Sequence, residues 1–74
     1  MSHQVLIIDD EKNIRVTLSR ALDLEGFSVR SAADGASGLA AITESRPDIV
    51  LLDLKLPDTT GLHVLEKIQA MEGD

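Results

Sequence analysis

The sequence predicts an α/β domain in which three strands and three helices alternate, in the order βαβαβα, around a parallel sheet. Two short apolar runs, at 4–9 and 48–53, and an alternating segment at 27–32 are each followed by a segment with apolar residues at helical spacing. Such alternation makes consecutive strands parallel, because each is joined to the next through a helix. With 74 residues and no convincing internal repeat, the chain is expected to form one small domain or part of one.

Two of the three predicted strands are of the fully buried type. Residues 4–9, QVLIID, and residues 48–53, DIVLLD, are apolar runs without polar alternation, which is typical of strands covered on both faces of a parallel sheet. Residues 27–32, FSVRSA, alternate because Ser28 and Arg30 separate the apolar side chains. This strand is therefore expected near an edge of the sheet.

The first helix is predicted between the acidic residues that follow the first strand and Gly26. Asp9, Asp10 and Glu11 suit the positive end of a helix dipole, and a glycine commonly follows the last turn of a helix. The apolar face of this helix is predicted to consist of Ile14, Leu18, Ala21 and Leu22.

The second helix is predicted to begin after Asp34, which is its expected N-cap, and Pro47 enforces its end. Gly35 and Gly38 lower its intrinsic helix propensity. Its inward-facing residues are predicted to be Leu39, Ile42, Ala36 and Ala40.

The third helix is predicted to begin after Thr60, a candidate cap. Its core stripe is predicted to consist of Leu62, Leu65 and Ile68. His63 lies early in this helix and is expected to face solvent, whereas His3 precedes the first strand and is expected to have no chemical role.

Composition argues against several functional classes. Hydrophobic residues make up 43% of the chain, and Phe27 is its only Phe, Trp or Tyr, so the core must be aliphatic. The net charge is −6 and lysine and arginine form no cluster, which argues against direct contact with nucleic acid or an anionic membrane. The longest apolar runs are far shorter than the roughly 18 residues that suggest a membrane span. MSHQV lacks the features of a signal peptide, so a cytoplasmic location is expected.

Three aspartates follow the two buried strands. Asp9 and Asp10 end the first strand and Asp53 ends the third, and parallel strands deliver their C-terminal ends to one edge of the sheet. If the two strands are neighbours, these carboxylates converge. Two like charges about 4 Å apart repel by roughly 4 kcal/mol at an effective dielectric near 20, so the cluster should bind a cation or hold a proton. Oxygen ligands without cysteine favour Mg²⁺ or Mn²⁺ over zinc.

Each aspartate also has a simpler interpretation. Asp10 could cap the first helix, and Asp53 could be a turn residue at the end of a strand. A carboxylate beside Mg²⁺ can also act as a nucleophile in aspartyl-phosphate chemistry. The conjunction of an acidic pair after the first strand with a lone aspartate after the third favours a functional site, with Asp53 as the candidate acceptor.

The chain resembles the receiver domain of bacterial two-component response regulators, and those of transcription regulators in particular, in four segments: VLIIDDE, LEGFSV, AADGASGLAAI and PDIVLLDLKLPDTTGLHVLEKI. The resemblance covers almost the whole chain. It implies that Asp53 accepts a phosphoryl group from a histidine kinase or phosphotransfer protein. It implies that Mg²⁺ is held by Asp10, by Asp53 and by the main-chain carbonyl of Lys55, with Asp9 acting through water. The Lys55 side chain would lie near the phosphoryl group.

The chain departs from this family in length. A complete receiver has a doubly wound, flavodoxin-like sheet of order 2-1-3-4-5, so residues 1–74 resemble a truncated receiver of order 2-1-3 that lacks strands 4 and 5. The Ser or Thr and the Lys that respond to the phosphoryl group would be missing. Thr59 and Thr60 lie on the wrong loop to replace that hydroxyl. The free edge of strand three predicts a homo-oligomer.

Three functions therefore remain open at the level of sequence. The first is a phosphoacceptor signalling module that is not an enzyme, and the second is a structural or oligomerising fragment without phosphotransfer. The third is a Mg²⁺-dependent phosphohydrolase that uses an aspartyl phosphate. Enzymes of this third kind typically show Asp-x-Asp-x-Thr, whereas Asp53-Leu54-Lys55 lacks the second aspartate.

Overall fold

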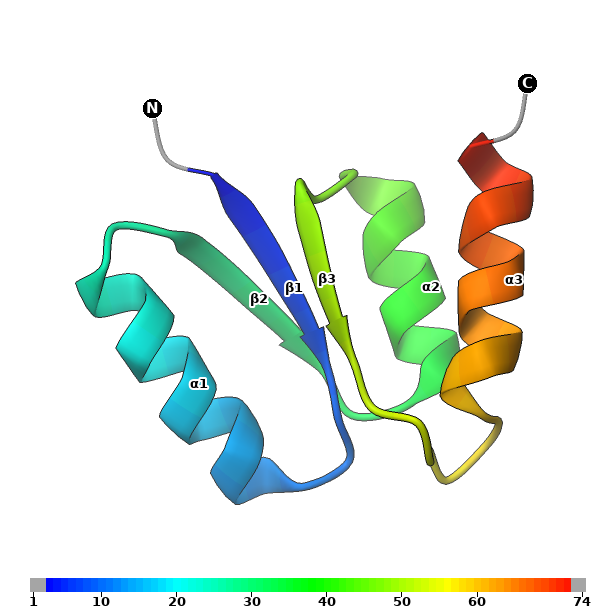
Figure 1. Ribbon diagram of the computed structural model, residues 1–74, viewed down its shortest axis with the longest axis horizontal. Coiled ribbons are helices and arrows are strands. Elements are labelled where there is room, and N and C mark those ends of the chain that lie inside the picture. The colour runs from blue at the N-terminus through cyan, green and yellow to red at the C-terminus, as the bar shows by residue number, and fades with distance from the viewer. Residues whose placement is uncertain (1–2, 73–74) are drawn as a thin grey trace.

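The computed structural model describes residues 3–72, which form a three-stranded parallel sheet with helices on both faces. The elements in chain order are β1 (Gln4–Ile8), α1 (Lys12–Leu24), β2 (Ser28–Ala32), α2 (Gly35–Glu44), β3 (Ile49–Leu52) and α3 (Gly61–Glu72). The strand order is β2-β1-β3, and both pairings are parallel. Figure 1 shows α1 on one face of the sheet and α2 and α3 on the other. The predicted fold class, its strand order and the edge position of the second strand are confirmed.

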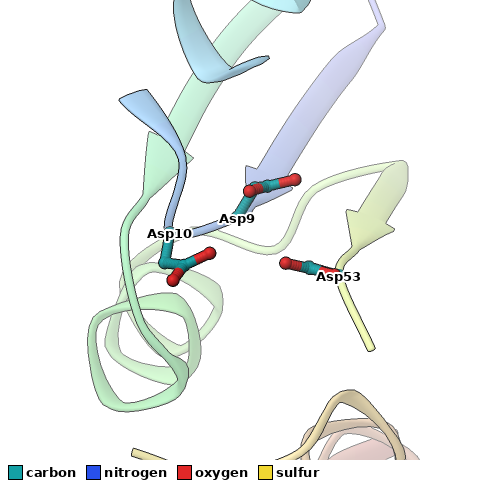
Figure 2. A group of neighbouring side chains, drawn as sticks. All are labelled: Asp9, Asp10 and Asp53. Atoms are coloured by element: carbon teal, nitrogen blue, oxygen red, sulfur yellow. The ribbon is translucent and has the colours of Figure 1, made fainter. Parts of the chain in front are cut away.

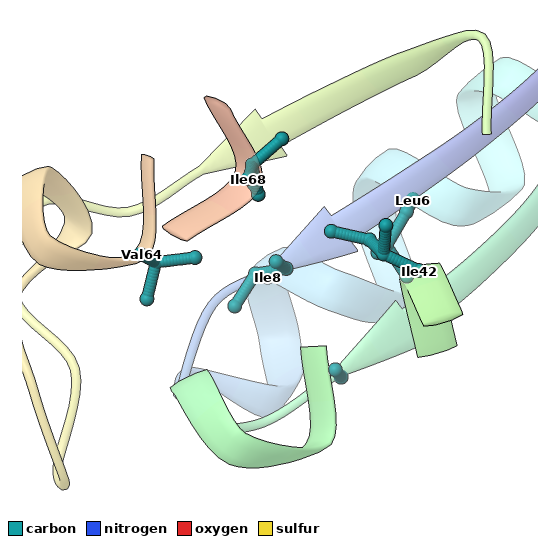
Figure 3. Close-up of a cluster of buried hydrophobic side chains, with 6 residues drawn as sticks. Leu6, Ile8, Ile42, Val64 and Ile68 are labelled. Atoms are coloured by element: carbon teal, nitrogen blue, oxygen red, sulfur yellow. The ribbon is translucent and has the colours of Figure 1, made fainter. Parts of the chain in front are cut away.

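The core is built around β1, the central strand. Its four residues from Val5 to Ile8 are all buried, with at most 2% of each exposed. Successive side chains of a strand point to opposite faces, so Leu6 and Ile8 face α2 and α3 whereas Val5 and Ile7 face α1. The main hydrophobic cluster, shown in Figure 3, consists of Leu6, Ile8, Ala32, Ile42, Val64 and Ile68. The prediction of an aliphatic core and of a doubly covered first strand is confirmed.

The helix α2 packs on the sheet through its glycines. Ala36 and Ala40 are exposed, so their predicted inward orientation is wrong, whereas Gly35, Gly38 and Ile42 are buried. A Cβ atom at Gly38 would lie 2.5 Å from the Ile8 Cδ1 atom, so only a residue without a side chain allows this approach. The glycines that weaken the helix as an isolated segment are therefore what bring it close to β1.

The strand β3 is covered on one face only, so its predicted burial on both faces is wrong. Ile49 and Leu51 are 44% and 38% exposed, and their register with Val5 and Ile7 places them on the α1 face of the sheet. α1 packs against β1 and β2 and leaves this part of the face open.

The core stripe of α3 also differs from the prediction. Ile68 is buried as expected, but the second core residue is Val64, which is fully buried. Leu62 and Leu65 are 63% and 43% exposed. They line an apolar groove of about 520 Å³ beside the free edge of β3, together with Val50, Leu52, Leu54, Pro47, Asp48, Gly61 and Ile68. The helix is therefore rotated so that positions 64 and 68, one turn apart, face β1.

The ends of the helices follow the predicted signals, but the predicted face of α1 is only partly covered. Gly26 has a φ of 95°, the left-handed conformation that favours glycine after a helix. The Asp34 side chain caps α2 by accepting a hydrogen bond from the Ser37 N–H, and the Thr60 hydroxyl accepts one from the His63 N–H. No residue of α1 is fully buried, and Ile14 is 39% exposed. None of the helices within residues 3–72 combines the length and apolar character that crossing a bilayer requires.

Candidate functional site

The acidic residues after β1 and β3 lie side by side at the carboxyl edge of the sheet. The Asp53 N–H donates to the Ile8 carbonyl at 2.9 Å, and the Asp9 N–H donates to the Ala32 carbonyl at 3.1 Å. The first bond extends the pairing of β3 with β1 by one residue and holds these two strand ends in register, and the second extends the pairing of β1 with β2. Oxygen atoms of Asp9, Asp10 and Asp53 all lie within 4.8 Å of one another. The predicted convergence of the three carboxylates is confirmed, and Figure 2 shows those of Asp10 and Asp53 pointing toward each other.

The turn between β1 and α1 is held by main-chain and side-chain hydrogen bonds. The Asp9 carboxylate accepts a hydrogen bond from the Glu11 N–H at 2.9 Å, and the Arg15 guanidinium donates to the Asp9 carbonyl at 2.8 Å. α1 begins at Lys12 with Glu11 as its N-cap residue, and no side chain caps it. Asp10 therefore does not occupy the capping position, and the capping alternative for this residue is wrong. Its carboxylate is exposed and directed to the acidic cluster.

The cluster lines a shallow depression of about 520 Å³ whose residues are Asp9, Asp10, Glu11, Ile14, Asp53, Leu54 and Lys55. Four of these side chains are acidic and one is basic. His63 makes its 3.9 Å contact with Glu66 on α3, does not line the depression, and is solvent-facing as predicted. His3 lies near Asp48, at the opposite end of the strands. The available donors are oxygen atoms, so the depression fits a hard divalent cation such as Mg²⁺.

The loop between β3 and α3, residues 53–60, folds back tightly on itself. The Leu56 N–H donates to the Thr59 carbonyl at 3.1 Å, and the Gly61 N–H donates to the Leu54 carbonyl at 2.8 Å. Together these two bonds make up an isolated antiparallel bridge between Lys55 and Thr60. The site end of this loop is therefore fastened by two main-chain hydrogen bonds, which hold the Lys55 main chain beside Asp53.

Asp58, at the tip of this loop, is a residue whose importance the sequence did not reveal. Its carboxylate accepts hydrogen bonds from the Gly35 N–H at 2.8 Å and from the Ala36 N–H at 2.9 Å, both at the start of α2. These two bonds, led by that from Gly35, lower the pKa of the Asp58 carboxyl. No periodicity or motif links residues so far apart in the chain, and the only local signal is an acidic residue in a loop.

Comparison with known proteins gives one family. Residues 5–74 match the family described as the response regulator receiver domain. The chain is 41% identical over 73 residues to the transcriptional regulatory protein PrrA of Mycobacterium tuberculosis, and 36% identical over 72 residues to the sporulation initiation phosphotransferase F of Bacillus subtilis. Among solved structures, the response regulator protein TrrA of Thermotoga maritima, in complex with Mg²⁺-BeF, superposes with a TM-score of 0.91 at 33% sequence identity.

These matches cover nearly all of this chain but only part of each relative. The alignment takes in 99% of this chain and 31% of PrrA, and 97% of this chain and 58% of the phosphotransferase. In the TrrA comparison, 97% of this chain corresponds to 62% of the other.

Proposed function

The chain belongs to the response regulator receiver domain family, and from this we propose that it is a phosphoacceptor module of two-component signal transduction in which Asp53 receives the phosphoryl group. The observation that carries the proposal is the position of Asp53. It directly follows β3, at the edge of the sheet where oxygen atoms of Asp9 and Asp10 lie within 4.8 Å of its own carboxylate.

The proposed reaction is a transfer from a phosphohistidine of a histidine kinase or phosphotransfer protein. A carboxylate oxygen of Asp53 forms a bond to phosphorus while the bond between phosphorus and the donor imidazole nitrogen breaks. The imidazole nitrogen keeps the electron pair of the broken bond, and proton exchange with solvent leaves the imidazole ring neutral. Asp53 lines an open depression and is partly exposed, so a donor side chain can reach it from solvent.

The metal ligands are proposed to be Asp10, Asp53 and the main-chain carbonyl of Lys55, with Asp9 acting through water. The convergence of the three carboxylates supports this assignment, and so does the Mg²⁺-BeF complex of the TrrA relative. When bound, Mg²⁺ or Mn²⁺ would neutralise charge on the transferring phosphoryl group. The Lys55 side chain borders the same depression, and we place it next to the phosphoryl group.

Intact mass tests the acceptor assignment. The chain is incubated with Mg²⁺ and a small phosphodonor such as acetyl phosphate, alongside Asp53→Asn and the control Asp23→Asn, an exposed residue of α1. We expect one added phosphoryl group on the wild type and on the control, and none on Asp53→Asn. Phosphate that is added regardless of Asp53→Asn would refute the assignment.

A second role, as an oligomerising unit, is supported by the edge of the sheet. β3 is a terminal strand of the described sheet, and Ile49 and Leu51 on it are partly exposed. Unpaired strand edges with apolar side chains favour pairing with another chain. We propose that copies of this chain associate through β3. Such association does not require phosphotransfer to Asp53 and does not exclude it.

Several finer points of the sequence analysis remain predictions. Family membership favours a signalling module over the phosphohydrolase alternative, because the matched family is that of receivers. The absence of Ser/Thr and Lys switch residues, a role in transcription, a lack of direct nucleic-acid contact and a cytoplasmic location stay predictions. The treatment of residues 1–74 as a truncated receiver domain does so too.

A further inference from the structure

The loop that carries the candidate acceptor is tied to α2 at its tip. The Asp58 carboxylate accepts the N–H groups of Gly35 and Ala36, which are 23 and 22 residues away along the chain. The first N–H groups of a helix have no partner within the helix, and they lie at its positive end. A carboxylate that bridges two of them is therefore held in both position and direction.

Gly35 makes this contact possible. It is buried, and a Cβ atom placed on it would meet the Thr59 methyl group and come within 3.3 Å of a carboxylate oxygen of Asp58. The same Cβ atom would lie 3.2 Å from Val64 Cγ2, on α3. The start of α2 is thus a bare backbone surface on which the loop and the first turn of α3 rest.

α2 does not depend on Asp58 for its own cap. Asp34 occupies the N-cap position and accepts a hydrogen bond from the Ser37 N–H at 2.7 Å. Asp34 and Asp58 are therefore two carboxylates on one helix end, with separate N–H partners. Of these two carboxylates, that of Asp58 is the one that connects this helix to the loop that follows Asp53.

The hydrogen bonds of Asp58 are linked to the acidic site through the main-chain bonds of the folded loop. The Leu56 N–H bonds to the Thr59 carbonyl next to Asp58, and the Gly61 N–H bonds to the Leu54 carbonyl. These two bonds form the Lys55–Thr60 bridge and close the loop beside Asp53. A displacement at the tip must therefore move the main chain of Lys55. The Asp53 carboxylate is in turn near that main chain, since its oxygen lies 3.4 Å from the Lys55 N atom.

We propose that Asp58 is a positioning residue for the acidic site, because its attachment to the start of α2 holds the Lys55 carbonyl and the Asp53 carboxylate in the arrangement that receives Mg²⁺. The proposal rests on the metal ligands assigned under the proposed function. Loss of Asp58 should then weaken metal binding even though Asp58 itself does not touch the ion. A residue that only stabilises α2 would have no such effect on the folded chain.

Mg²⁺ titration tests this, with Asp34→Ala as the matched control. Asp58→Ala and Asp34→Ala each remove one negative charge and one carboxylate from the same end of α2, but only Asp58→Ala releases the loop. We expect Asp58→Ala to weaken Mg²⁺ binding on the order of tenfold, which is typical of losing a group that orients metal ligands. Asp34→Ala should stay near the wild-type value. Asp58→Asn keeps one acceptor oxygen and should recover part of the affinity.

Amide hydrogen exchange without metal supplies a second readout. The amides of Leu56 and Gly61 report the closed loop, and both should exchange faster in Asp58→Ala than in Asp34→Ala. Unchanged Mg²⁺ affinity in folded Asp58→Ala, or equal losses in the two alanine variants, would overturn the proposal. If Asp58→Ala fails to fold, the same comparison is made with Asp58→Asn and Asp34→Asn.

The two proposals fail in distinguishable ways. A wild-type chain that binds Mg²⁺ but takes no phosphate on Asp53 refutes the phosphoacceptor function, and the Mg²⁺ affinities of the variants still decide the role of Asp58. A wild-type chain that binds no Mg²⁺ refutes the ligand assignment and, with it, the positioning role.

Discussion

At the scale of single residues, Gly61 lies where the chain passes directly over the main chain of Asp53. A Cβ atom at this position would meet the Asp53 carbonyl oxygen, Leu54 Cα and the Asp53 carbonyl carbon. All three are backbone atoms, which cannot rotate away as the end of a side chain can. The acceptor and the start of α3 can approach only through a glycine.

We therefore expect Gly61→Ala to destabilise the fold by about 1 to 3 kcal/mol, as overpacking against fixed atoms does. It should also slow phosphorylation of Asp53, because relief of the clash must shift the Asp53 main chain. Urea unfolding and intact mass measure the two effects. Gly26→Ala is the control: its φ of 95° penalises alanine, but no atom lies within 4 Å of the added Cβ. It should lower stability and leave phosphorylation unchanged, and a normal rate in Gly61→Ala would contradict the prediction.

Asp58 should make stability depend on pH. The Gly35 and Ala36 N–H groups hold the pKa of its carboxyl below the ordinary value in the folded chain. The unfolded pKa is about 3.9, so the stabilising effect of the charged carboxylate is complete above that value and is lost as the pH falls through the folded pKa. The difference in urea midpoint between wild type and Asp58→Asn should thus be largest near about pH 6 and shrink toward about pH 2.5. A difference that is constant across this range would contradict the expected sign.

At the scale of elements, α2 is a weak helix that is held at both ends by other parts of the fold. Asp34 and Asp58 bind its N–H groups at the start. At the other end, the Arg30 guanidinium of β2 donates to the Ala41 carbonyl at 2.9 Å and to the Ser45 carbonyl. Negative groups at the N-terminus and a positive group at the C-terminus both suit the helix dipole. These contacts offset the low propensity of a helix that contains two glycines.

Removal of the Arg30 guanidinium from the C-terminal end of α2 should therefore lower the stability of the fold. We expect Arg30→Met to destabilise the fold by about 1 to 2 kcal/mol, because the carbonyls of Ala41 and of the C-cap residue Ser45 lose a charged donor while the aliphatic part of the side chain is kept. Arg20→Met on the exposed side of α1 is the matched control and should change stability by less than about 0.5 kcal/mol. Denaturant unfolding of both variants measures the difference, and equal values would exclude a special role for Arg30.

At the scale of the whole molecule, the apolar surface around β3 is the least covered part of the fold. The α1 face exposes Ile49 and Leu51, and the opposite face has the groove of about 520 Å³ that Leu62 and Leu65 line. Both surfaces adjoin the free edge of the strand. Each side of β3 thus presents apolar surface beside the free edge, and exposed apolar surface of this kind marks interaction sites.

The association proposed through β3 should depend on concentration and on this surface. Sedimentation of the wild type is expected to show species larger than a monomer, and Leu51→Lys should return the chain to a monomer because a lysine on an edge strand disfavours pairing. Val16→Lys, on α1, is the control, since Val16 is 48% exposed and lies away from β3. A wild-type monomer that unfolds cooperatively at low micromolar concentration would contradict the proposal.

The sequence by itself determined the order of elements, the parallel sheet and the placement of Asp9, Asp10 and Asp53 at one edge of that sheet, whereas the pairing of β1 with β3, which brings the three carboxylates together, belongs to the tertiary structure. Apolar runs and helical spacing are local properties, and parallel strands that follow one another must end at the same edge. The helix signals at Gly26 and Asp34 were local as well. These features depend on neighbours in the chain, so a single sequence was enough to predict them.

Only the tertiary structure decided which faces are covered and what holds the site. The burial of Gly38 against Ile8 replaced the predicted alanines, and Val64 replaced Leu62 and Leu65 in the core. Such outcomes depend on how a packed helix is rotated and how close it lies to the sheet. Hydrophobic periodicity leaves the inward-facing residue uncertain by about one position. The bond from Asp58 to α2 joins residues 22 and 23 positions apart, through a loop whose path no local pattern specifies. Packing between distant segments, rather than propensity along the chain, places this support at the tip of the loop that follows Asp53.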